Sequence, residues 1–429
     1  MVMRPMTGNG TDAAESREYT ETSPMNSGFK TRSVVVVGGG LVGLATAWRL
    51  LQSRRCDEVT LLEKDATVAS QQSTHNSGVL HSGLSYRPGS EKAALSVRGL
   101  RQMVEFCQEH GVRHEICGKI VVATNPAEVS RLDALWERGT HNGLVGLRRL
   151  DSPAAIRELE PHAAGIAAIQ VPQEGIVDYR GVADALEREI GRLGGRVVVK
   201  ARVTRIERSG GVWRLASTAG DFGAELVINC GGLHADRIVA LSGMKPAARI
   251  VPFRGEYLRL RPAAEHLVRH LIYPVPDPRF PFLGVHFTRM IGGGIEAGPN
   301  AVLAFAREGY TPLSINPRDL AESLTTPALW RFIARHASMS AYELYRSLSR
   351  GAFCRSLQKL VPEVTPRDLA PGGAGVRAQA MWPDGRLVDD FHFVRGDGIL
   401  HVVNAPSPAA TASLAIGERI VATIDGNAG

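Results

Sequence analysis

The sequence is poor in cysteine and has no apolar run long enough to cross a membrane. Its 429 residues include five cysteines, which form no CxxC pair and no set with metal-ligand spacing, and an odd number does not suit a disulfide framework. The uncharged stretch at 33–48 is shorter than the ~20 residues that span a bilayer, and it carries four glycines. We therefore expect a protein of a reducing compartment, the cytoplasm, without a metal site.

The sequence also lacks a block of basic residues, although its formal net charge is +7. The excess of basic residues is scattered along the chain, so nucleic acid is not an expected partner. The positive charge suits an anionic substrate and an anionic membrane surface equally well. Peripheral contact with the inner face of the membrane thus stays open. Residues 1–30 are rich in Ser, Thr, Asn and Gly without the apolar core of a secretory signal, so we expect a disordered extension there.

A βαβ unit follows this extension. Residues 33–37 are a serine and four valines, and such a β-branched run is typical of a strand buried on both faces of a parallel sheet. A glycine turn comes next, then apolar residues at helical spacing from 41 to about 52, and then a second strand at 59–63. The pattern predicts an α/β fold that begins with a Rossmann-type domain.

The turn between strand and helix has the spacing GxGxxG. Gly38 permits a tight turn, Gly40 lets the backbone approach a pyrophosphate, and Gly43 lets the helix pack closely on the strand. Glu63 ends the next strand about 20 residues later, where it can accept hydrogen bonds from ribose hydroxyls. The motif predicts a dinucleotide site but does not distinguish FAD from NAD.

The sequence texture changes at about residue 245. From there to about 367 the chain has Pro-rich, aromatic-containing segments without βα alternation, which indicates a second, mixed or antiparallel α+β domain. The interrupted order predicts a discontinuous nucleotide domain at 31–117, 178–244 and 368–429, with a substrate-binding domain at 118–177 and 245–367.

Several longer motifs resemble a known family. They are HNSGVLHSG at 75–83, CGKI at 117–120, GIVDY at 175–179, VPFRGEY at 251–257, PVPDPRFPFLGVHFT at 274–288, GPNAVLA at 298–304, GVRAQ at 375–379 and NAPSPAAT at 404–411. Together they are similar to the D-amino-acid-oxidase-like flavoproteins and, within these, to the L-2-hydroxyglutarate oxidases and dehydrogenases. The resemblance covers roughly residues 33 to 420.

The resemblance implies an FAD-dependent enzyme that oxidises a small anionic 2-hydroxy dicarboxylate, L-2-hydroxyglutarate, to 2-oxoglutarate. Electrons would pass to dioxygen or to a quinone of the respiratory chain, and an amine, amino-acid or glycerol-3-phosphate oxidoreductase of the same fold is the alternative. The residues expected to bind FAD are Gly38, Gly40, Leu41, Val42, Gly43, Glu63, Lys64, His75, Asn76, Ser77, Gly78, Val203, Gly231, Gly375, Pro406, Ser407, Ala410 and Thr411.

Oxidation of a hydroxy acid needs a base for the hydroxyl proton, and histidine titrates in the right range. His81 and His286 lie in the matching motifs and are equal candidates, with His75 and His401 as further possibilities.

The two carboxylates of such a substrate are expected to be bound by two arginines, whose guanidinium groups hold a carboxylate with two hydrogen bonds, or by an arginine and a tyrosine. Arg254, Tyr257 and Arg377 are therefore the expected substrate ligands, and Arg289 is a weaker candidate. Pro408 is expected in the first turn of the last helix, whose N-terminus would face the flavin ring.

Overall fold

The computed structural model describes residues 31–278 and 283–424. The disordered extension predicted for residues 1–30 lies outside the described residues.

Within the described residues, one lobe is built on a six-stranded sheet. Its strands are β1 (Thr31–Val37), β2 (Cys56–Leu62), β9 (Arg196–Val198), β13 (Leu226–Asn229), β20 (His392–Gly396) and β21 (Ile399–Asn404), in the order β20-β21-β13-β1-β2-β9. Neighbouring strands are parallel except β20 and β21. The carboxyl ends of β1 and β2 therefore meet at one edge of the sheet, where the glycine turn lies.

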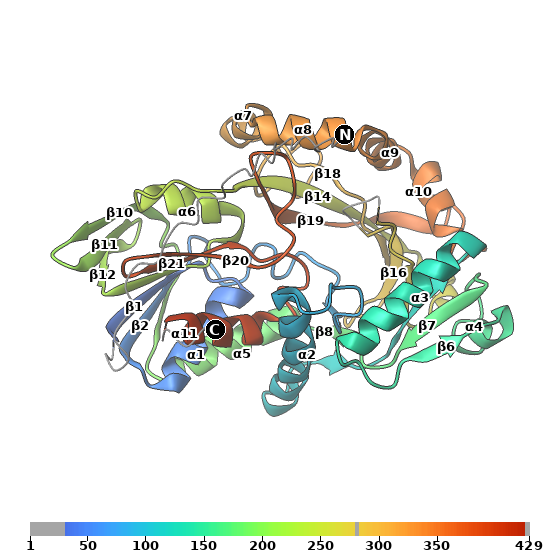
Figure 1. The fold of residues 1–429 in the computed structure, drawn as a ribbon, viewed down its shortest axis with the longest axis horizontal. Coiled ribbons are helices and arrows are strands. Elements are labelled where there is room, and N and C mark those ends of the chain that lie inside the picture. The colour runs from blue at the N-terminus through green and yellow to red at the C-terminus, as the bar shows by residue number, and fades with distance from the viewer. Residues whose placement is uncertain (1–30, 279–282, 425–429) are drawn as a thin grey trace, which may run out of the picture.

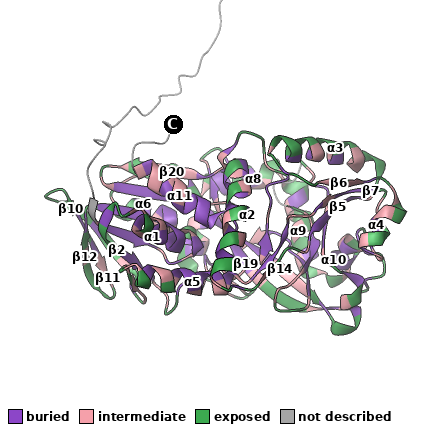
Figure 2. Ribbon diagram, turned by 90° about the horizontal axis from the view of Figure 1, so that it is seen from below, coloured by how far each residue is buried: buried purple, intermediate pink, exposed green. Residues whose placement is uncertain are grey.

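Both faces of β1 are covered, which explains its run of valines. Val34 and Val36 pack in one core with helices α1 (Leu41–Ser53), α5 (Tyr179–Arg192) and α11 (Ser413–Ile424). Val35 and Val37 point the other way, into a core shared with the antiparallel sheet of β10 (Val203–Ser209), β11 (Val212–Ser217) and β12 (Gly220–Ala224). Alternate side chains of a strand face opposite sides, so two cores require apolar residues at every position. Figure 2 shows the resulting buried layers.

The other lobe is built on a nine-stranded mixed sheet within the described residues. Its strands are β5 (Lys119–Ala123), β6 (Arg148–Leu150), β7 (Ala167–Val171), β14 (Arg249–Leu260), β15 (Leu271–Pro274), β16 (His286–Arg289), β17 (Ile295–Gly298), β18 (Val302–Leu303) and β19 (Leu369–Met381). The pairs are antiparallel except β15 with β5. Helices α3 (Pro126–His141), α4 (Pro153–Leu159) and α10 (Arg350–Leu357) bury apolar side chains against it.

The remaining elements connect or cover the two lobes (Figure 1). They are β3 (Val79–Leu80), β4 (His114–Glu115), β8 (Gly175–Val177), α2 (Glu91–Glu109), α6 (Ala235–Leu241), α7 (Pro317–Leu324), α8 (Pro327–Arg335), α9 (Ala337–Leu348) and the short 3-10 helices η1 (Gly232–His234) and η2 (Pro262–Leu267). No helix in the described ranges has the length and apolar character needed to cross a membrane.

Strand pairing crosses two of the expected domain boundaries. β19 pairs with β14 along most of its length, although residues 368–429 were expected in the nucleotide domain. β8 pairs with β3 and β4, although residues 118–177 were expected in the substrate domain. β19 also contributes Gly375 to Gln379 to the lining of the cavity described below.

Candidate active site

The glycine turn has the geometry that its spacing predicts. Gly38 has a φ of 109°, and a Cβ there would lie 2.4 Å from the carbonyl oxygen of Cys230. A Cβ at Gly43 would lie 1.9 Å from the carbonyl oxygen of Gly38, so only glycine lets α1 pack this closely on the turn. Gly40 is the N-cap of α1, without a side-chain cap, and the first turn of α1 has no acidic residue. This end of the helix is suited to an anionic group.

Glu63 follows β2 and faces the turn. Its Oε2 accepts a hydrogen bond from the Gly39 amide at 2.7 Å, and its Oε1 accepts one from the Asp65 amide at 2.8 Å. Lys64 is held beside the turn, because its Nζ forms ion pairs with Asp65 at 2.7 Å and Glu308 at 2.8 Å. The carboxylate is thus fixed at the position expected for contact with a ribose.

A cavity of about 1650 Å³ extends from this turn to the nine-stranded sheet. Its lining includes most residues expected to bind FAD, namely Gly38, Gly40, Leu41, Val42, Glu63, Lys64, His75, Asn76, Ser77, Val203, Gly231, Gly375, Pro406, Ser407, Ala410 and Thr411. Gly43 and Gly78 do not line it but shape the loops that do, since Gly78 has a φ of 65° and its Cβ would lie 2.9 Å from the Val177 carbonyl oxygen.

Four histidines were candidates for the base, and three of them line the cavity. His81 follows β3, and its amide donates to Thr411 Oγ1 at 3.2 Å. His286 stacks on Tyr273 with ring centroids 3.9 Å apart. His75 stacks on Tyr310 at 4.0 Å. His401 is fully buried on β21 outside the cavity, so it cannot touch a ligand there.

Of the two arginines expected to bind substrate, only one lines the cavity. Arg377 and Tyr257 line the cavity, and the missing side chain of Gly255 makes room for Arg377, whose Nη1 would lie 2.9 Å from a Cβ there. Arg254 is buried away from the cavity, where its Nη2 donates to Glu256 Oε1 at 2.7 Å and its Nη1 to the Thr311 carbonyl at 2.9 Å. Its expected role as a substrate ligand is therefore corrected to an internal ion pair.

Arg289, the weaker candidate, also lies outside the main cavity. It forms an ion pair with Glu115 beside a separate small pocket. Arg377 is thus the cation that remains from the sequence prediction at the substrate end.

The start of the last helix differs from the prediction. Residues 407–412 form turns and α11 begins at Ser413, so Pro408 is not in its first turn. The segment still closes the cavity, because Thr411 Oγ1 is 2.8 Å from Tyr179 Oη and donates to the Val79 carbonyl at 3.1 Å. A backbone turn, rather than a helix N-terminus, therefore lines this part of the cavity.

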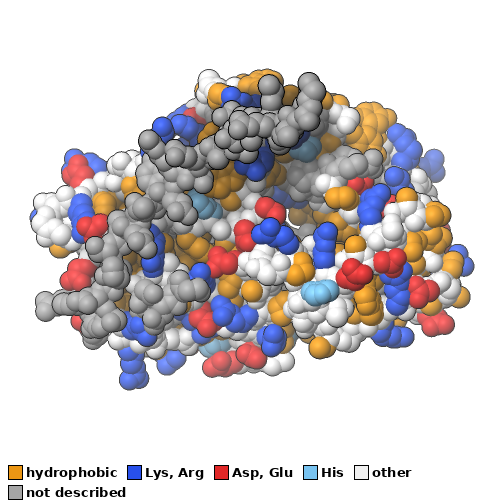
Figure 3. All heavy atoms as spheres, viewed as in Figure 1, with side chains coloured by type: hydrophobic (Ala, Val, Ile, Leu, Met, Phe, Trp, Pro, Cys, Tyr) orange, Lys and Arg blue, Asp and Glu red, His pale blue; other side chains and the backbone are white. Residues whose placement is uncertain are grey.

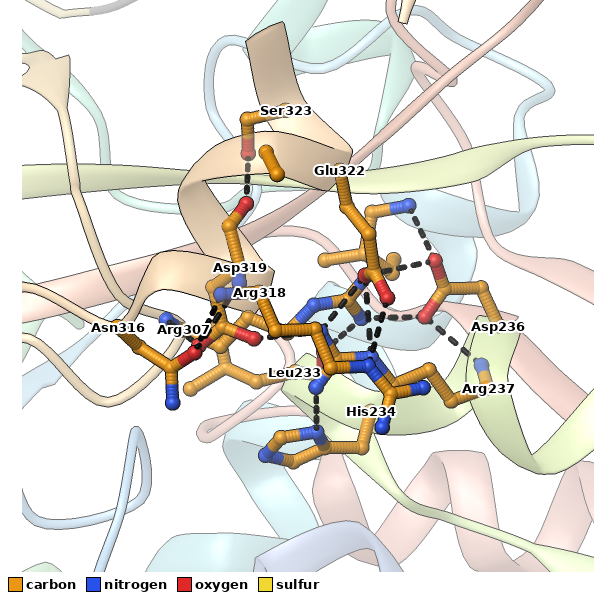
Figure 4. A network of polar contacts seen from close by, with 12 residues as sticks. Leu233, His234, Asp236, Arg237, Arg307, Asn316, Arg318, Asp319, Glu322 and Ser323 are labelled. Atoms are coloured by element: carbon orange, nitrogen blue, oxygen red, sulfur yellow. Dashed lines mark hydrogen bonds and ion pairs between the residues drawn. The ribbon is translucent and has the colours of Figure 1, made fainter. Parts of the chain in front are cut away.

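A buried network of charges joins the two lobes beside the cavity (Figure 4). Arg307 donates from Nη2 to Asp236 Oδ2 at 2.9 Å and from Nη1 to the Leu233 carbonyl at 2.6 Å. Arg237 donates to Glu322 at 2.6 Å. The network thereby ties η1 and α6 of the first lobe to α7.

The chain matches the FAD dependent oxidoreductase (DAO) family over residues 33–423. It belongs to that family. The flavoprotein is 46% identical over 388 residues to "L-2-hydroxyglutarate dehydrogenase" of Indibacter alkaliphilus, covering 90% of this chain and 97% of the relative. It is 43% identical to that of Escherichia coli strain K12, covering 91% and 92%, and 44% identical to the human mitochondrial one, covering 90% and 87%.

Solved structures share the fold. L-α-glycerophosphate oxidase of Mycoplasma pneumoniae with FAD bound has a TM-score of 0.75 at 21% identity, covering 92% of this chain and 94% of that one. Glycine oxidase of Geobacillus kaustophilus has a TM-score of 0.65 at 19% identity, covering 92% and 95%. The predicted fold class and FAD as the cofactor are confirmed.

The residues of the flavoprotein fit FAD. The uncapped N-terminus of α1 suits the pyrophosphate, Glu63 suits the adenosine ribose, and the far end of the cavity leads to the histidines. At Gly375 the backbone approaches so closely that a Cβ would lie 2.2 Å from the His75 carbonyl oxygen. Only glycine lets the backbone at 375 pass this close to the loop that carries His75.

Sequence reasoning missed two charged residues at the substrate end of the flavoprotein. Lys119 lines the cavity, and Glu174 is buried behind it with their Nζ and Oε2 atoms 2.6 Å apart. Lys119 stands in the CGKI motif at the start of an otherwise apolar strand, and Glu174 precedes GIVDY. The sequence did carry a signal for Lys119, because a lysine in a strand whose other residues are all apolar and buried needs a specific partner.

Proposed function

We propose that this flavoprotein oxidises L-2-hydroxyglutarate to 2-oxoglutarate. The observation that carries the proposal is its similarity to the L-2-hydroxyglutarate dehydrogenases, at 43% to 46% identity over about nine tenths of the chain. When bound, FAD supplies the acceptor for the hydride that leaves the α-carbon.

The residues around the substrate end support this chemistry. Arg377 is a fork-shaped donor for one carboxylate, and Tyr257 beside it provides a hydroxyl. His81 and His286 both line the same end, so a histidine can take the hydroxyl proton as hydride leaves. The buried surroundings of Tyr273 and His286 exclude water and strengthen these contacts.

The test is anaerobic reduction of the purified holoprotein, followed by the loss of yellow flavin absorbance. We expect L-2-hydroxyglutarate to bleach the flavin and D-2-hydroxyglutarate not to. Bleaching by glycine or L-α-glycerophosphate instead would replace the proposal with the amine or glycerol-phosphate alternative. Protein that is purified in folded form without flavin would refute both.

We further propose that the face formed by α7 to α10 contacts an anionic lipid surface. Most of the large apolar side chains that are exposed among the described residues lie between 305 and 348, including Trp330, Leu344 and Leu348. The acidic residues between 309 and 360 are buried or half-buried, whereas several arginines there are exposed. Apolar and basic side chains together suit an anionic interface, and Figure 3 shows the two kinds side by side near α9 and α10.

Vesicle flotation tests this contact. We expect binding to vesicles that contain phosphatidylglycerol, loss of binding in the triple variant W330S/L344S/L348S, and retention in V145S, which removes an exposed apolar side chain elsewhere. Absence of binding by the unaltered protein would refute the contact. Because quinones reside in lipid, we also expect reduced protein to be reoxidised faster by a quinone than by dioxygen.

A further inference from the structure

We propose that Glu174, paired with Lys119, is a positioning residue that orients His81 as the base for the substrate hydroxyl. The inference rests on the proposed oxidation of a 2-hydroxy acid and assigns the base that the sequence left open between two histidines. Neither Lys119 nor Glu174 was among the residues expected from the sequence.

Glu174 is held by two separate parts of the chain, the segment of His81 and Ser82 and the strand that begins at Lys119. Its Oε1 accepts hydrogen bonds from the Ser82 amide at 3.0 Å and the Ser82 hydroxyl at 2.6 Å. Its Oε2 lies 2.6 Å from Lys119 Nζ and 3.6 Å from His81 Nδ1. Glu174 is 1% exposed, so its orientation is fixed by these contacts rather than by solvent. Both oxygens are thus committed, and the second is directed at Lys119 and His81.

Lys119 makes a buried carboxylate tolerable. Burial acts to raise the pKa of Glu174, but the charge of Lys119 and the interactions with His81 outweigh it and hold that pKa far below the usual range. Lys119 is itself placed by Tyr273, with Nζ 4.9 Å from the ring centroid. Glu174 is therefore an anion at every pH at which the protein is expected to work, and towards His81 it acts only as a negative charge and hydrogen-bond acceptor on the Nδ1 side of the ring.

A carboxylate at Nδ1 selects one tautomer of a histidine. The separation of 3.6 Å is longer than a hydrogen bond, so Glu174 acts on His81 through its charge: a carboxylate on the Nδ1 side favours the proton on Nδ1 and leaves the Nε2 lone pair as the acceptor on a ring that lines the cavity. During oxidation the substrate O–H bond breaks and its proton goes to Nε2. The C–O bond becomes C=O, and the electron pair of the C–H bond leaves as hydride to FAD. Glu174 then stabilises the imidazolium that forms, as in other carboxylate–histidine pairs.

Within residues 31–278 and 283–424, no carboxylate lies at His286 in the way that Glu174 lies at His81. Its Nδ1 lies 2.8 Å from the Gly284 carbonyl oxygen, and burial with the nearby His81, Lys119 and Arg377 lowers its pKa to about 3. A histidine surrounded by positive groups resists taking up a proton. His286 therefore serves as a neutral hydrogen-bonding group on the cavity wall, and His81 is the residue that can hold the proton.

The test compares Glu174→Gln with a matched control, Glu160→Gln. Glu160 is also buried beside a histidine, with Oε1 2.9 Å from His270 Nδ1, but it lies outside the cavity. We expect E174Q to slow anaerobic flavin reduction at saturating substrate by about 10- to 100-fold, the range typical for loss of a carboxylate that orients a histidine ligand of a metal site. E160Q should leave that rate unchanged. Both should retain FAD and bind 2-oxoglutarate with Kd within a few-fold of the unaltered protein.

Two further readouts separate positioning from structural damage. In the His81→Gln background E174Q should cause no further loss of rate, and an equal loss in both backgrounds would overturn the proposal. Nitrogen NMR of labelled histidine, assigned with His81→Gln, should show the Nδ1–H tautomer in the unaltered protein and its loss in E174Q. An unchanged tautomer would equally overturn it.

If E174Q loses FAD, Glu174→Asp takes its place, because the shorter side chain moves the carboxylate away from His81. Its rate of flavin reduction is then compared in the unaltered and His81→Gln backgrounds, and the same outcomes support or overturn the proposal. Failure of the unaltered protein to be reduced by L-2-hydroxyglutarate would refute the proposed substrate alone. The comparison would then be made with whichever compound of the panel bleaches the flavin, and the tautomer measurement needs no substrate.

Discussion

Removal of the Glu296 carboxylate should make the stability of this flavoprotein less dependent on pH. Glu296 lies on β17, opposite Thr288 and Arg259 of the neighbouring strands, and is 7% exposed. Its Oε2 has no hydrogen-bond partner within the described part of the chain. Burial raises the pKa of Glu296 to about 7, against the opposing effects of Arg259 and a hydrogen bond with Ser77.

The sign follows from proton binding in the two states. Below pH 4.5 the carboxyl is protonated whether the chain is folded or unfolded, so it leaves the stability unchanged. Between that pH and about 7 the folded state keeps the proton that the unfolded state has lost, and the free energy of unfolding falls as pH rises. At about 1.4 kcal/mol per pKa unit, the loss reaches about 3 kcal/mol and stays constant above pH 7.

Glu296→Gln retains the shape of the protonated side chain and removes the titration. We expect equal urea stability of E296Q and the unaltered protein near pH 4.5, and a gain for E296Q that grows to about 3 kcal/mol at pH 8, measured with saturating FAD. Glu256→Gln should behave oppositely, because Ser347, Asn300 and Arg254 overcome burial and lower the pKa of Glu256. An E296Q effect that is constant with pH, or largest at low pH, would refute the reasoning.

Three other substitutions test separate parts of the description. Gly43→Ala should abolish FAD retention, because the new Cβ would lie 1.9 Å from the Gly38 carbonyl oxygen. Gly223→Ala is the control, since the nearest atom to its new Cβ is 3.9 Å away. Gly43→Ala protein that is purified with its yellow flavin would contradict the close packing. Arg307→Ala should lower the free energy of unfolding by about 3 to 5 kcal/mol in urea, since it leaves Asp236 buried without its cation, and a loss below about 1 kcal/mol would show that the network is dispensable. Arg377→Ala should weaken substrate binding by about 2 kcal/mol or more, roughly 30-fold, with FAD content unchanged. Arg254→Ala should leave the substrate Kd unaltered. If Arg377→Ala lost FAD to the same extent as it lost substrate binding, the role of Arg377 as a substrate ligand would be contradicted.

Local features were predictable from the sequence. The strand, turn and helix at 31–53 and the position of Glu63 follow from residues close together in the chain, whose patterns report periodicity and backbone geometry directly. The second lobe was predictable only as a class, because its pairing depends on contacts between distant strands. β19, for example, joins β14 across more than a hundred residues of sequence.

The site residues show the same limit. Arg254 and Arg377 stand in equally good motifs, and only the side on which each strand faces the cavity separates them. The contact of Glu174 with Lys119 and His81 joins three segments whose arrangement no local pattern reports. The position of α11 was missed by a few residues because the turns at 407–412 are held by Tyr179 and Val79, which lie far earlier in the chain.

The order of strands in the first sheet has a consequence for how the protein is made. β21 lies next to β13, and α11 packs on α1, so residues of the last tenth of the chain complete a sheet that begins with β1. During synthesis on the ribosome the glycine turn emerges early, but the segment around Thr411 that closes the cavity emerges almost at the end. The lining of the cavity is therefore complete only once this late segment has folded against the earlier ones. A chain that stopped shortly before residue 399 would lack β21 and α11, which would leave one edge of β13 unpaired and the cavity without the lining residues around Thr411.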